Sequence, residues 1–274
     1  MTEISPVVWL GDEACADVGV AGGKGASLAA MTAAGFNVPP AFVVHSGLLE
    51  RSVDAVRLRA LAKVGDHSAA EGLVRGAQPP VCAVSAAYER LGAGLVAVRS
   101  SACAEDSEEA SFAGQQDTYL NVLGAAETSR LVVECWASFF GERALFYRAN
   151  KGSLEDLAMA VVVQRMVEPE KSGVIFTVDP VAGRRDRMLV EAAFGLGEQV
   201  VSGHVTPDHY VIDRQGVVKT ERLVHGGVLS PDELVRLAEL GRQLEEYFGR
   251  PQDIEWGIAE GDVFLLQSRP VTTL

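Results

Sequence analysis

The sequence predicts an α+β fold with two lobes, and three observations lead to this expectation. With 274 residues, of which 48% are apolar, the chain can bury one large core or two moderate ones. Helical periodicity prevails over the first 150 residues. Short apolar runs bounded by turn residues prevail from residue 159 onward. We therefore expect an N-terminal lobe at 1–157 and a C-terminal lobe at 158–274, with a hinge near 152–158.

The N-terminal lobe is expected to combine a glycine-rich loop, several helices and two strands. Prolines at 39 and 40 prevent the first helix from continuing, and Gly35 is expected to cap its C-terminus. Apolar residues at every fourth position from Leu131 predict a later helix. The expected elements are a glycine-rich loop at 20–25, a helix at 26–34, a strand at 41–44, helices between 46 and 92 with a loop at 76–80, a strand at 96–98 and a helix at 127–149.

The C-terminal lobe is expected to contain a sheet and one long helix. Ser230 suits the N-cap of this helix, and Pro231 suits its first position. Gln215-Gly216 marks a hairpin turn between two strands. The expected strands are 159–166, 173–178, 188–193, 209–213 and 217–220, followed by a helix from 230 to about 248 and a closing hairpin.

Charge and composition exclude several functional classes. The net charge of −13 argues against a nucleic-acid partner, because phosphate backbones are bound by basic surfaces. A few cations gathered in a cleft can still attract ATP. No apolar run is long enough for a membrane span and no signal peptide pattern is visible, so we expect a cytoplasmic protein without membrane contact. The four scattered cysteines are expected to be reduced thiols rather than zinc ligands.

Three segments have the composition of phosphate-binding sites. The first is Gly22-Gly23-Lys24-Gly25-Ala26-Ser27, whose glycines allow close approach of a phosphate. The helix N-terminus that follows offers N–H groups, and Lys24 supplies a positive charge. The spacing is not that of a Walker A loop. Because glycine-rich helix starts also serve packing, both interpretations of this segment stay open.

The second segment is an apolar strand that delivers Arg99-Ser100-Ser101 to its end and continues through an acidic bend into 111–118. A cation, two hydroxyls and a loop of small residues and amides suit a lid over a polyphosphate. The structural alternative is an ion pair between Arg99 and Glu105 or Asp106. The dense run of small residues favours the phosphate-binding interpretation.

The third segment is a closing hairpin whose polar residues depend on its register. With a three-residue loop, 260–262, Glu255 lies opposite Gln267 and Asp253 lies opposite Arg269 on one face. A two-residue loop would scatter these four residues over both faces. We therefore predict the three-residue loop, with Gly261 in the left-handed conformation. The pairs expected on the apolar face are Ile254 with Ser268, Trp256 with Leu266, and Ile258 with Phe264.

This polar face predicts a site for Mg²⁺ and a phosphoryl group. Its carboxylates and amide supply the oxygen ligands that Mg²⁺ prefers, and Arg269 lies beside them. A solvated sheet face with a cross-strand Asp–Arg pair is the structural alternative. The presence of two other phosphate-like segments in the same chain favours the metal site.

Together these segments resemble the nucleotide-binding domain of phosphoenolpyruvate synthase, pyruvate phosphate dikinase and rifampin phosphotransferase. The likeness covers most of the chain in the order found in that family. The block 206–210 is somewhat more similar to the rifampin enzyme than to the others. The matching stretches are 22–28, 98–122, 163–167, 172–177, 195–198, 206–210, 253–256 and 267–270.

The resemblance implies an ATP-grasp fold, in which two α+β lobes hold ATP between them, with Mg²⁺ as a cofactor. It implies that Lys24, Arg99 and Arg269 are catalytic and contact the phosphates, Arg269 being the candidate for the transferred group. Phosphoryl transfer requires positioning and charge neutralisation more than covalent chemistry by the protein, which agrees with these roles. The other implied roles are phosphate loop for Gly114 and Thr118, adenine and ribose for Gln164, Mg²⁺ for Glu255 and Gln267, and support or sharing of that metal for Asp253.

The resemblance also implies a reaction that this chain does not complete alone. Family enzymes are longer and continue into a swivelling domain whose histidine carries the phosphoryl group. None of the five histidines here lies in such a motif. We expect an ATP-dependent phosphotransferase component that passes a pyrophosphoryl group to a histidine on a separate protein and releases AMP, for phosphorylation of a small molecule.

Three alternatives stay open. A stand-alone ATP-grasp kinase or ligase would phosphorylate its small-molecule acceptor directly. A non-catalytic nucleotide-binding module would have no need of all the polar residues that the implied site contains. The chain could also be a fragment of a longer enzyme.

Overall fold

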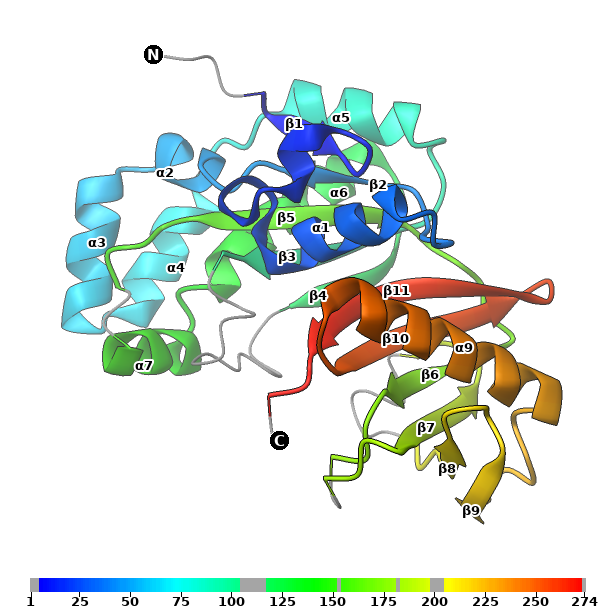
Figure 1. Ribbon diagram of the computed structural model, residues 1–274. Coiled ribbons are helices and arrows are strands. Elements are labelled where there is room, and N and C mark those ends of the chain that lie inside the picture. The colour runs from blue at the N-terminus through cyan, green and yellow to red at the C-terminus, as the bar shows by residue number, and fades with distance from the viewer. Residues whose placement is uncertain (1–4, 104–116, 152–153, 181–182, 198–204, 273–274) are drawn as a thin grey trace. The chain divides into compact units, whose positions relative to one another are not determined.

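The computed structural model describes residues 5–103, 117–151, 154–180, 183–197 and 205–272. The chain divides into two compact units. The N-terminal unit contains residues 1–34 and 40–166, and the C-terminal unit contains residues 35–39 and 167–274. Each unit is an antiparallel sheet with helices packed on it, so the fold is α+β as predicted (Figure 1).

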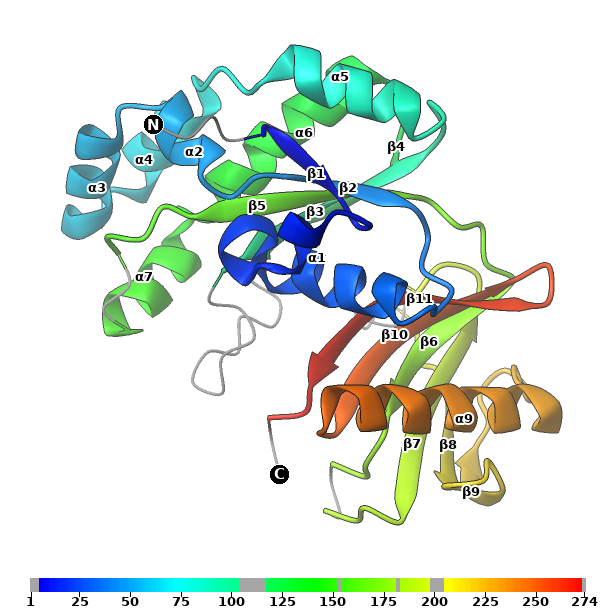
Figure 2. The same ribbon diagram turned by 45° about the horizontal axis from the view of Figure 1, so that its top comes forward.

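The N-terminal unit is built on a five-stranded sheet in the order β1-β2-β5-β3-β4. Helix α1 (Val18–Ala33) covers one face and α6 (Ala125–Ser138) covers the other (Figure 2). Along β3, Val96 and Val98 belong to the core beneath α6, so the alternate residues Arg99 and Ser101 belong to the face covered by α1. The strands are β1 (Val7–Trp9), β2 (Ala41–Val44), β3 (Val96–Ala102), β4 (Thr118–Val122) and β5 (Met159–Arg165).

Four short helices occupy the region between residues 46 and 92, as predicted. Asp54 and Asp66 cap two of them by accepting backbone N–H groups of the first helical turn. The predicted loop at 76–80 lies between the last two helices. The helices are α2 (Leu48–Ser52), α3 (Ala55–Val64), α4 (His67–Arg75) and α5 (Val81–Arg90), and a 3-10 helix at Glu13–Ala16 precedes α1.

The single helix predicted over 127–149 is wrong, because the structure has two helices there. Helix α6 ends at its C-cap Phe139, and α7 (Glu142–Lys151) begins after Gly141. Phe139 and Phe140 are both buried, and the guanidinium of Arg148 lies over both rings. A continuous helix would point these adjacent rings about 100° apart, whereas the turn lets both pack against one side chain.

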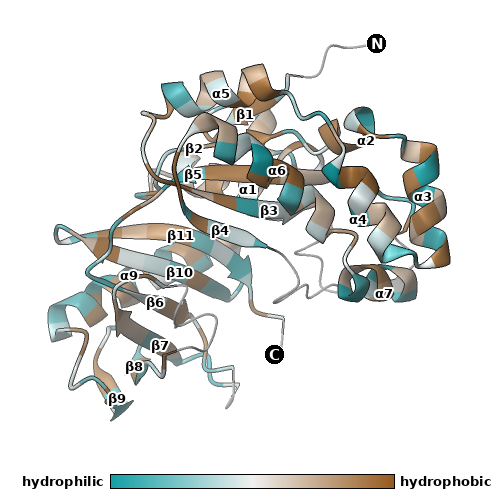
Figure 3. Cartoon of the chain, turned by 180° about the vertical axis from the view of Figure 1, so that it is seen from behind, coloured by the Kyte–Doolittle hydropathy of each residue, from teal (hydrophilic) through white to brown (hydrophobic). Residues whose placement is uncertain are grey.

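Strand β5 belongs to the N-terminal unit rather than to the lobe that we expected it to open. It lies in the middle of the five-stranded sheet, antiparallel to both β2 and β3. Helices cover both faces of that sheet, which is why this strand is apolar along most of its length (Figure 3). The boundary between the units therefore falls after residue 166 instead of after residue 157.

The C-terminal unit is built on a six-stranded antiparallel sheet in the order β11-β10-β6-β7-β8-β9. Helix α9 (Pro231–Phe248) packs on one face of this sheet (Figure 2). Ser230 and Glu233 form the capping box that starts α9, which contributes about 1 kcal/mol to helix stability. The strands are β6 (Lys171–Phe176), β7 (Arg187–Phe194), β8 (Asp208–Asp213), β9 (Val218–Arg222), β10 (Gln252–Ala259) and β11 (Asp262–Pro270).

The closing hairpin has a two-residue loop, so the predicted three-residue loop is wrong. Ala259 pairs with Asp262, and both Glu260 (φ 51°) and Gly261 (φ 80°) have left-handed backbone conformations. Such a pair matches the twist of the flanking strands better than a wider loop does. A bulge at Leu266 then absorbs one residue, because Trp256 pairs with Leu265 while Glu255 pairs with Gln267.

The structure also tests the expectation that the cysteines are reduced thiols. All four cysteines are free thiols in the structure, as expected. Burial raises the pKa of Cys15 to about 12 and that of Cys103 to about 11, so both thiols stay protonated at neutral pH.

In the described part of the chain, each helix is too short or too polar to cross a membrane.

Candidate functional site

The glycine-rich segment lies inside helix α1 instead of preceding it. We expected a loop at 20–25 and a helix from 26, but α1 starts at Val18, where the side chain of Asp17 accepts the N–H of Gly19. The helix is interrupted at Gly22, whose backbone is left-handed (φ 69°, ψ 174°). A Cβ at this position would collide with the carbonyl oxygen of Ser101, so only glycine fits.

Lys24 follows this break and is directed at strand β3. Its side chain is buried, with 8% of the residue exposed, and its Nζ donates to the carbonyl oxygen of Ser100 at 3.0 Å. The ammonium group is therefore held beside the residue that follows Arg99 in the strand. Two segments far apart in sequence place their cations in one region of the N-terminal unit.

Arg99 lies in the middle of β3 rather than at its end. The strand continues through Ala102, four residues beyond the predicted end at Val98, and Arg99 is buried there. Its Nη1 donates to Oε1 of Gln164 on the neighbouring strand β5 at 3.4 Å. The predicted adenine-side residue and the predicted phosphate-side arginine thus touch within the N-terminal unit.

The loop expected over the phosphates can be located only at its end. Thr118 is the first residue of β4 and lies directly opposite Arg99. Gly114, together with the acidic bend at 104–106, lies outside the described residues. The strand pair thus places the exposed Thr118 at the rim of the face that carries Arg99.

The C-terminal unit shows the polar face that the sequence predicts on the closing hairpin. Glu255 pairs with Gln267 and Asp253 pairs with Arg269, as predicted. These pairs survive the shorter loop because the bulge at Leu266 restores the register on the far side. All four polar side chains therefore belong to the face of the sheet opposite α9.

Asp253 pairs with Arg269 through only one of its two carboxylate oxygens. Nε and Nη2 of Arg269 both lie 2.8 Å from its Oδ2, whereas Oδ1 is buried with no hydrogen-bond partner among the described residues. Burial raises the pKa of the Asp253 carboxyl, and the charge and hydrogen bonds of Arg269 offset part of this rise. A buried carboxylate oxygen without a donor is the kind of group that a bound cation satisfies.

The oxygen donors on this face suit Mg²⁺ better than a metal ion held by protein side chains alone. In the described part of the chain, no three His, Cys, Asp or Glu side chains are arranged to hold a metal ion. Asp253, Glu255 and the amide of Gln267 supply oxygen donors from two adjacent strands. Mg²⁺ commonly takes one or two carboxylates and completes its shell with phosphate oxygens and water. The residues present therefore fit Mg²⁺ bound together with a phosphate.

Sequence reasoning missed a third carboxylate on this face. Glu255 and Glu191 both lie directly opposite Val174, on its two neighbouring strands, so all three share a face. The Nδ1 of His209 lies 3.5 Å from Oε1 of Glu191. The period-two alternation of β7 could have placed Glu191 on this face, but the strand order that brings it into line with Glu255 is a tertiary feature.

Each unit thus carries its own cluster of polar side chains. The cluster in the N-terminal unit holds Lys24, Arg99 and Gln164 on the α1-covered face. The cluster in the C-terminal unit holds oxygen donors and one arginine. Buried cations bind phosphates, and carboxylates hold the divalent ion that accompanies them.

Comparison with known proteins identifies the family to which these features correspond. The family described as "Pyruvate phosphate dikinase, AMP/ATP-binding domain" matches residues 81–227 and 215–274. The chain is 42% identical, over 94% of its length, to "Probable phosphoenolpyruvate synthase" of Methanothermobacter thermautotrophicus, of which it covers 45%. It is 43% identical, over 94% of its length, to "Rifampicin phosphotransferase" of Streptomyces sviceus, of which it covers 35%. The chain spans less than half the length of these relatives.

Proposed function

This chain belongs to the family of pyruvate phosphate dikinase AMP/ATP-binding domains, and from that premise we propose that it is the ATP-binding component of a phosphotransferase. Residues of both units would contact the nucleotide. The observation that carries the proposal is the set Asp253, Glu255, Gln267 and Arg269 on one face of the closing hairpin. A solvated surface pair would leave unexplained the buried Oδ1 of Asp253.

The N-terminal unit would contact the phosphates and the nucleoside. Lys24 and Arg99 are buried against the same sheet, so their charges are little screened by solvent. Thr118, and Gly114 from the adjoining loop, would lie over the phosphates. Gln164 would contact adenine and ribose, and its contact with Arg99 would relate the position of the nucleoside to that of the phosphates.

The C-terminal unit would contribute the metal and the transfer chemistry. Glu255 and Gln267 would hold Mg²⁺, with Oδ1 of Asp253 supporting or sharing it. When bound, Mg²⁺ neutralises charge on the phosphate oxygens. Arg269 would stabilise the charge on the group in transit, and Asp253 fixes the direction of its guanidinium.

The proposed transfer leaves atoms and charge in balance. A neutral imidazole nitrogen on a separate protein attacks the β-phosphorus of ATP. The bond from that phosphorus to the oxygen bridging the α- and β-phosphates breaks, and this oxygen leaves on AMP. The imidazole gives up its ring proton. Water then attacks the outer phosphorus of the pyrophosphoryl group, the bond from that phosphorus to the bridging oxygen breaks, and inorganic phosphate leaves. The one phosphoryl group left on the histidine passes to a small molecule, and the imidazole regains a proton.

The experiment follows ATP labelled at its β-phosphate. The chain is incubated with Mg-ATP alone, and then with a neighbouring-gene product that carries a mobile histidine domain. We expect Mg-ATP binding by calorimetry and little AMP from the chain alone. With the partner, AMP should form and acid-labile label should appear on the partner.

Other outcomes would contradict parts of this proposal. Rapid turnover with a small acceptor and no partner would refute the split arrangement. ADP as the product in that reaction would support direct transfer by a stand-alone kinase or ligase. No measurable Mg-ATP binding would refute the nucleotide site itself.

A further inference from the structure

The hydroxyl of Ser101 bridges the break in helix α1. In a continuous helix the N–H of Gly25 would donate to the carbonyl oxygen of Ala21, four residues earlier. Here the hydroxyl of Ser101, from strand β3, lies between these two groups. It accepts from the N–H of Gly25 at 3.1 Å and donates to the carbonyl oxygen of Ala21 at 2.8 Å.

The other carbonyl groups next to the break are also satisfied from outside the helix. The hydroxyl of Ser46 donates to the carbonyl oxygen of Gly19, and the backbone N–H of Ser46 donates to that of Val20 at 3.0 Å. Three successive carbonyl groups before Gly22 therefore have partners on β3 or after β2. A side chain that enters the helical hydrogen-bond ladder leaves backbone groups without their usual partners, and each of these groups then needs another partner. The hydrogen bonds from Ser46 and Ser101 meet this need, so the interruption is a stable feature of the fold.

A hydroxyl is the group that this position requires. It can donate one hydrogen bond and accept another at the same atom, which the methyl group of alanine cannot do. Ser101 is fully buried, and its backbone is in contact with Gly22, so the strand and the turn fit closely. The same strand carries Arg99, and the carbonyl of Ser100 accepts from Lys24.

We infer that Ser101 is a positioning residue that couples the glycine turn of α1 to the arginine strand β3. Ser101 keeps the helix open at Gly22. It thereby fixes the positions of Lys24 and Arg99 relative to each other, so that both would contact the terminal phosphates. This inference rests on the proposed function for its consequence, but the bridge itself is a contact of the N-terminal unit. The sequence analysis assigned this hydroxyl to the phosphate-binding segment and did not predict its contact with α1.

The test compares Ser101→Ala and Ser101→Thr with the wild-type chain. Calorimetry measures the affinity for Mg-ATP and, separately, for AMP, which lacks the terminal phosphates. We expect Ser101→Ala to bind Mg-ATP at least tenfold more weakly and AMP less than twofold more weakly. Ser101→Thr keeps the hydroxyl and should bind Mg-ATP within threefold of wild type. Exchange of the Gly25 amide hydrogen should be faster in Ser101→Ala, because its acceptor is gone.

A matched control separates positioning from general loss of stability. Thr128→Val removes another buried hydroxyl of the same unit, whose hydrogen bond goes to the carbonyl of Gly124. It should leave both nucleotide affinities and the Gly25 exchange unchanged. Unchanged Mg-ATP affinity in Ser101→Ala, equal losses for ATP and AMP, or failure of Ser101→Thr to restore binding would each overturn the inference. If the wild-type chain does not bind Mg-ATP, the proposed function fails, whereas Gly25 exchange still tests the bridge.

Discussion

The guanidinium of Arg269 is held in place by the carboxylate of Asp253. Nε and Nη2 of Arg269 both lie 2.8 Å from Oδ2 of Asp253, which orients the guanidinium. An arginine that stabilises charge only during transfer contributes mainly to rate and little to ground-state binding. The role proposed for Arg269 therefore predicts a separation between binding and transfer at this position.

We expect Arg269→Ala to bind Mg-ATP within tenfold of wild type and to lose transfer by roughly 10³-fold or more. Calorimetry and transfer of the labelled β-phosphate provide the two measurements. The substitution leaves the Asp253 carboxylate buried without its partner, so Asp253→Asn combined with Arg269→Ala serves as the stability control. Transfer at the wild-type rate in Arg269→Ala would remove it from the mechanism.

Asp208 is a second residue whose environment permits a definite prediction. Burial by itself raises the pKa of this carboxyl, but four backbone N–H groups together outweigh burial and hold the pKa below its ordinary value. Its Oδ1 accepts from Val224 and His225, and its Oδ2 accepts from Gly227 and Val228. The carboxylate therefore fastens the loop that follows β9 to the start of β8.

Because the folded pKa is the lower one, the Asp208 carboxylate stabilises the fold above its unfolded pKa of about 4. That contribution is lost as the pH falls through the folded value. We expect Asp208→Asn to be less stable by about 1–3 kcal/mol at pH 7, with the difference shrinking below pH 4. Urea denaturation at several pH values measures this difference. A difference independent of pH would show that ionisation of Asp208 does not matter.

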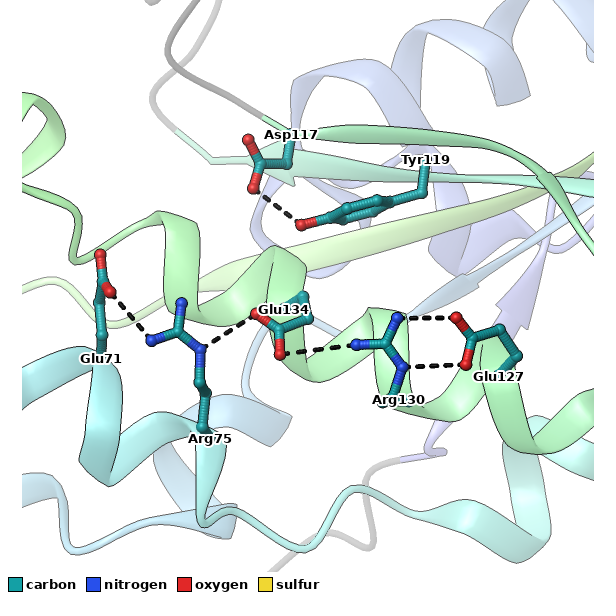
Figure 4. Close-up of polar contacts among 7 residues, drawn as sticks. All are labelled: Glu71, Arg75, Asp117, Tyr119, Glu127, Arg130 and Glu134. Atoms are coloured by element: carbon teal, nitrogen blue, oxygen red, sulfur yellow. Dashed lines mark hydrogen bonds and ion pairs between the residues drawn. The ribbon is translucent and has the colours of Figure 1, made fainter.

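At the scale of elements, α4 and α6 are joined by a row of alternating charges (Figure 4). Glu134 of α6 lies 3.1 Å from Nε of Arg75 on α4, and 3.7 Å from Nη1 of Arg130 on its own helix. Outer carboxylates, Glu71 and Glu127, pair with the two arginines. Both arginine side chains are about half exposed, so solvent and salt screen these pairs.

A double-mutant cycle on Arg75→Ala and Glu134→Ala tests the strength of this inter-helix pair. We expect a coupling free energy of about 0.5 kcal/mol at low ionic strength, because one partner is half exposed. The coupling should nearly vanish in 1 M salt. A coupling several times larger, or one insensitive to salt, would show that the row behaves as a buried network.

At the scale of the whole molecule, the proposal requires both units to bind one nucleotide. Lys24→Ala and Glu255→Gln alter different units, yet each should weaken Mg-ATP binding at least tenfold. Lys63→Ala removes a charge from an exposed side chain of the N-terminal unit and should leave the affinity unchanged. Calorimetry measures all three variants, and wild-type affinity in Lys24→Ala or Glu255→Gln would contradict a shared site.

Hydrogen exchange provides an independent test of the shared nucleotide. Saturating Mg-ATP at a hundred times its dissociation constant adds about 2.7 kcal/mol to the stability of whatever it contacts. Protection should therefore rise in β3 of the N-terminal unit and in β10 of the C-terminal unit. Increased protection confined to one unit would show that the nucleotide does not engage the other.

Much of the candidate site could be predicted from sequence because its residues follow local rules. Strand alternation and cross-strand pairing are local, so the pairs Glu255 with Gln267 and Asp253 with Arg269 followed from the hairpin alone. The loop length was wrong even so, since a bulge at Leu266 compensates for the shorter turn. A bulge has no strong sequence signal, and the correct pairs were reached through an incorrect loop.

The sequence by itself determined the α+β composition, the capped helix at Ser230 and the polar face of the closing hairpin, because periods, caps and alternation act within a few residues. Only the tertiary structure decided that β5 joins the N-terminal sheet, that Gln164 meets Arg99, and that Ser101 enters the break in α1. These contacts join residues more than fifty positions apart. Their geometry depends on how sheets and helices pack, which no short segment specifies.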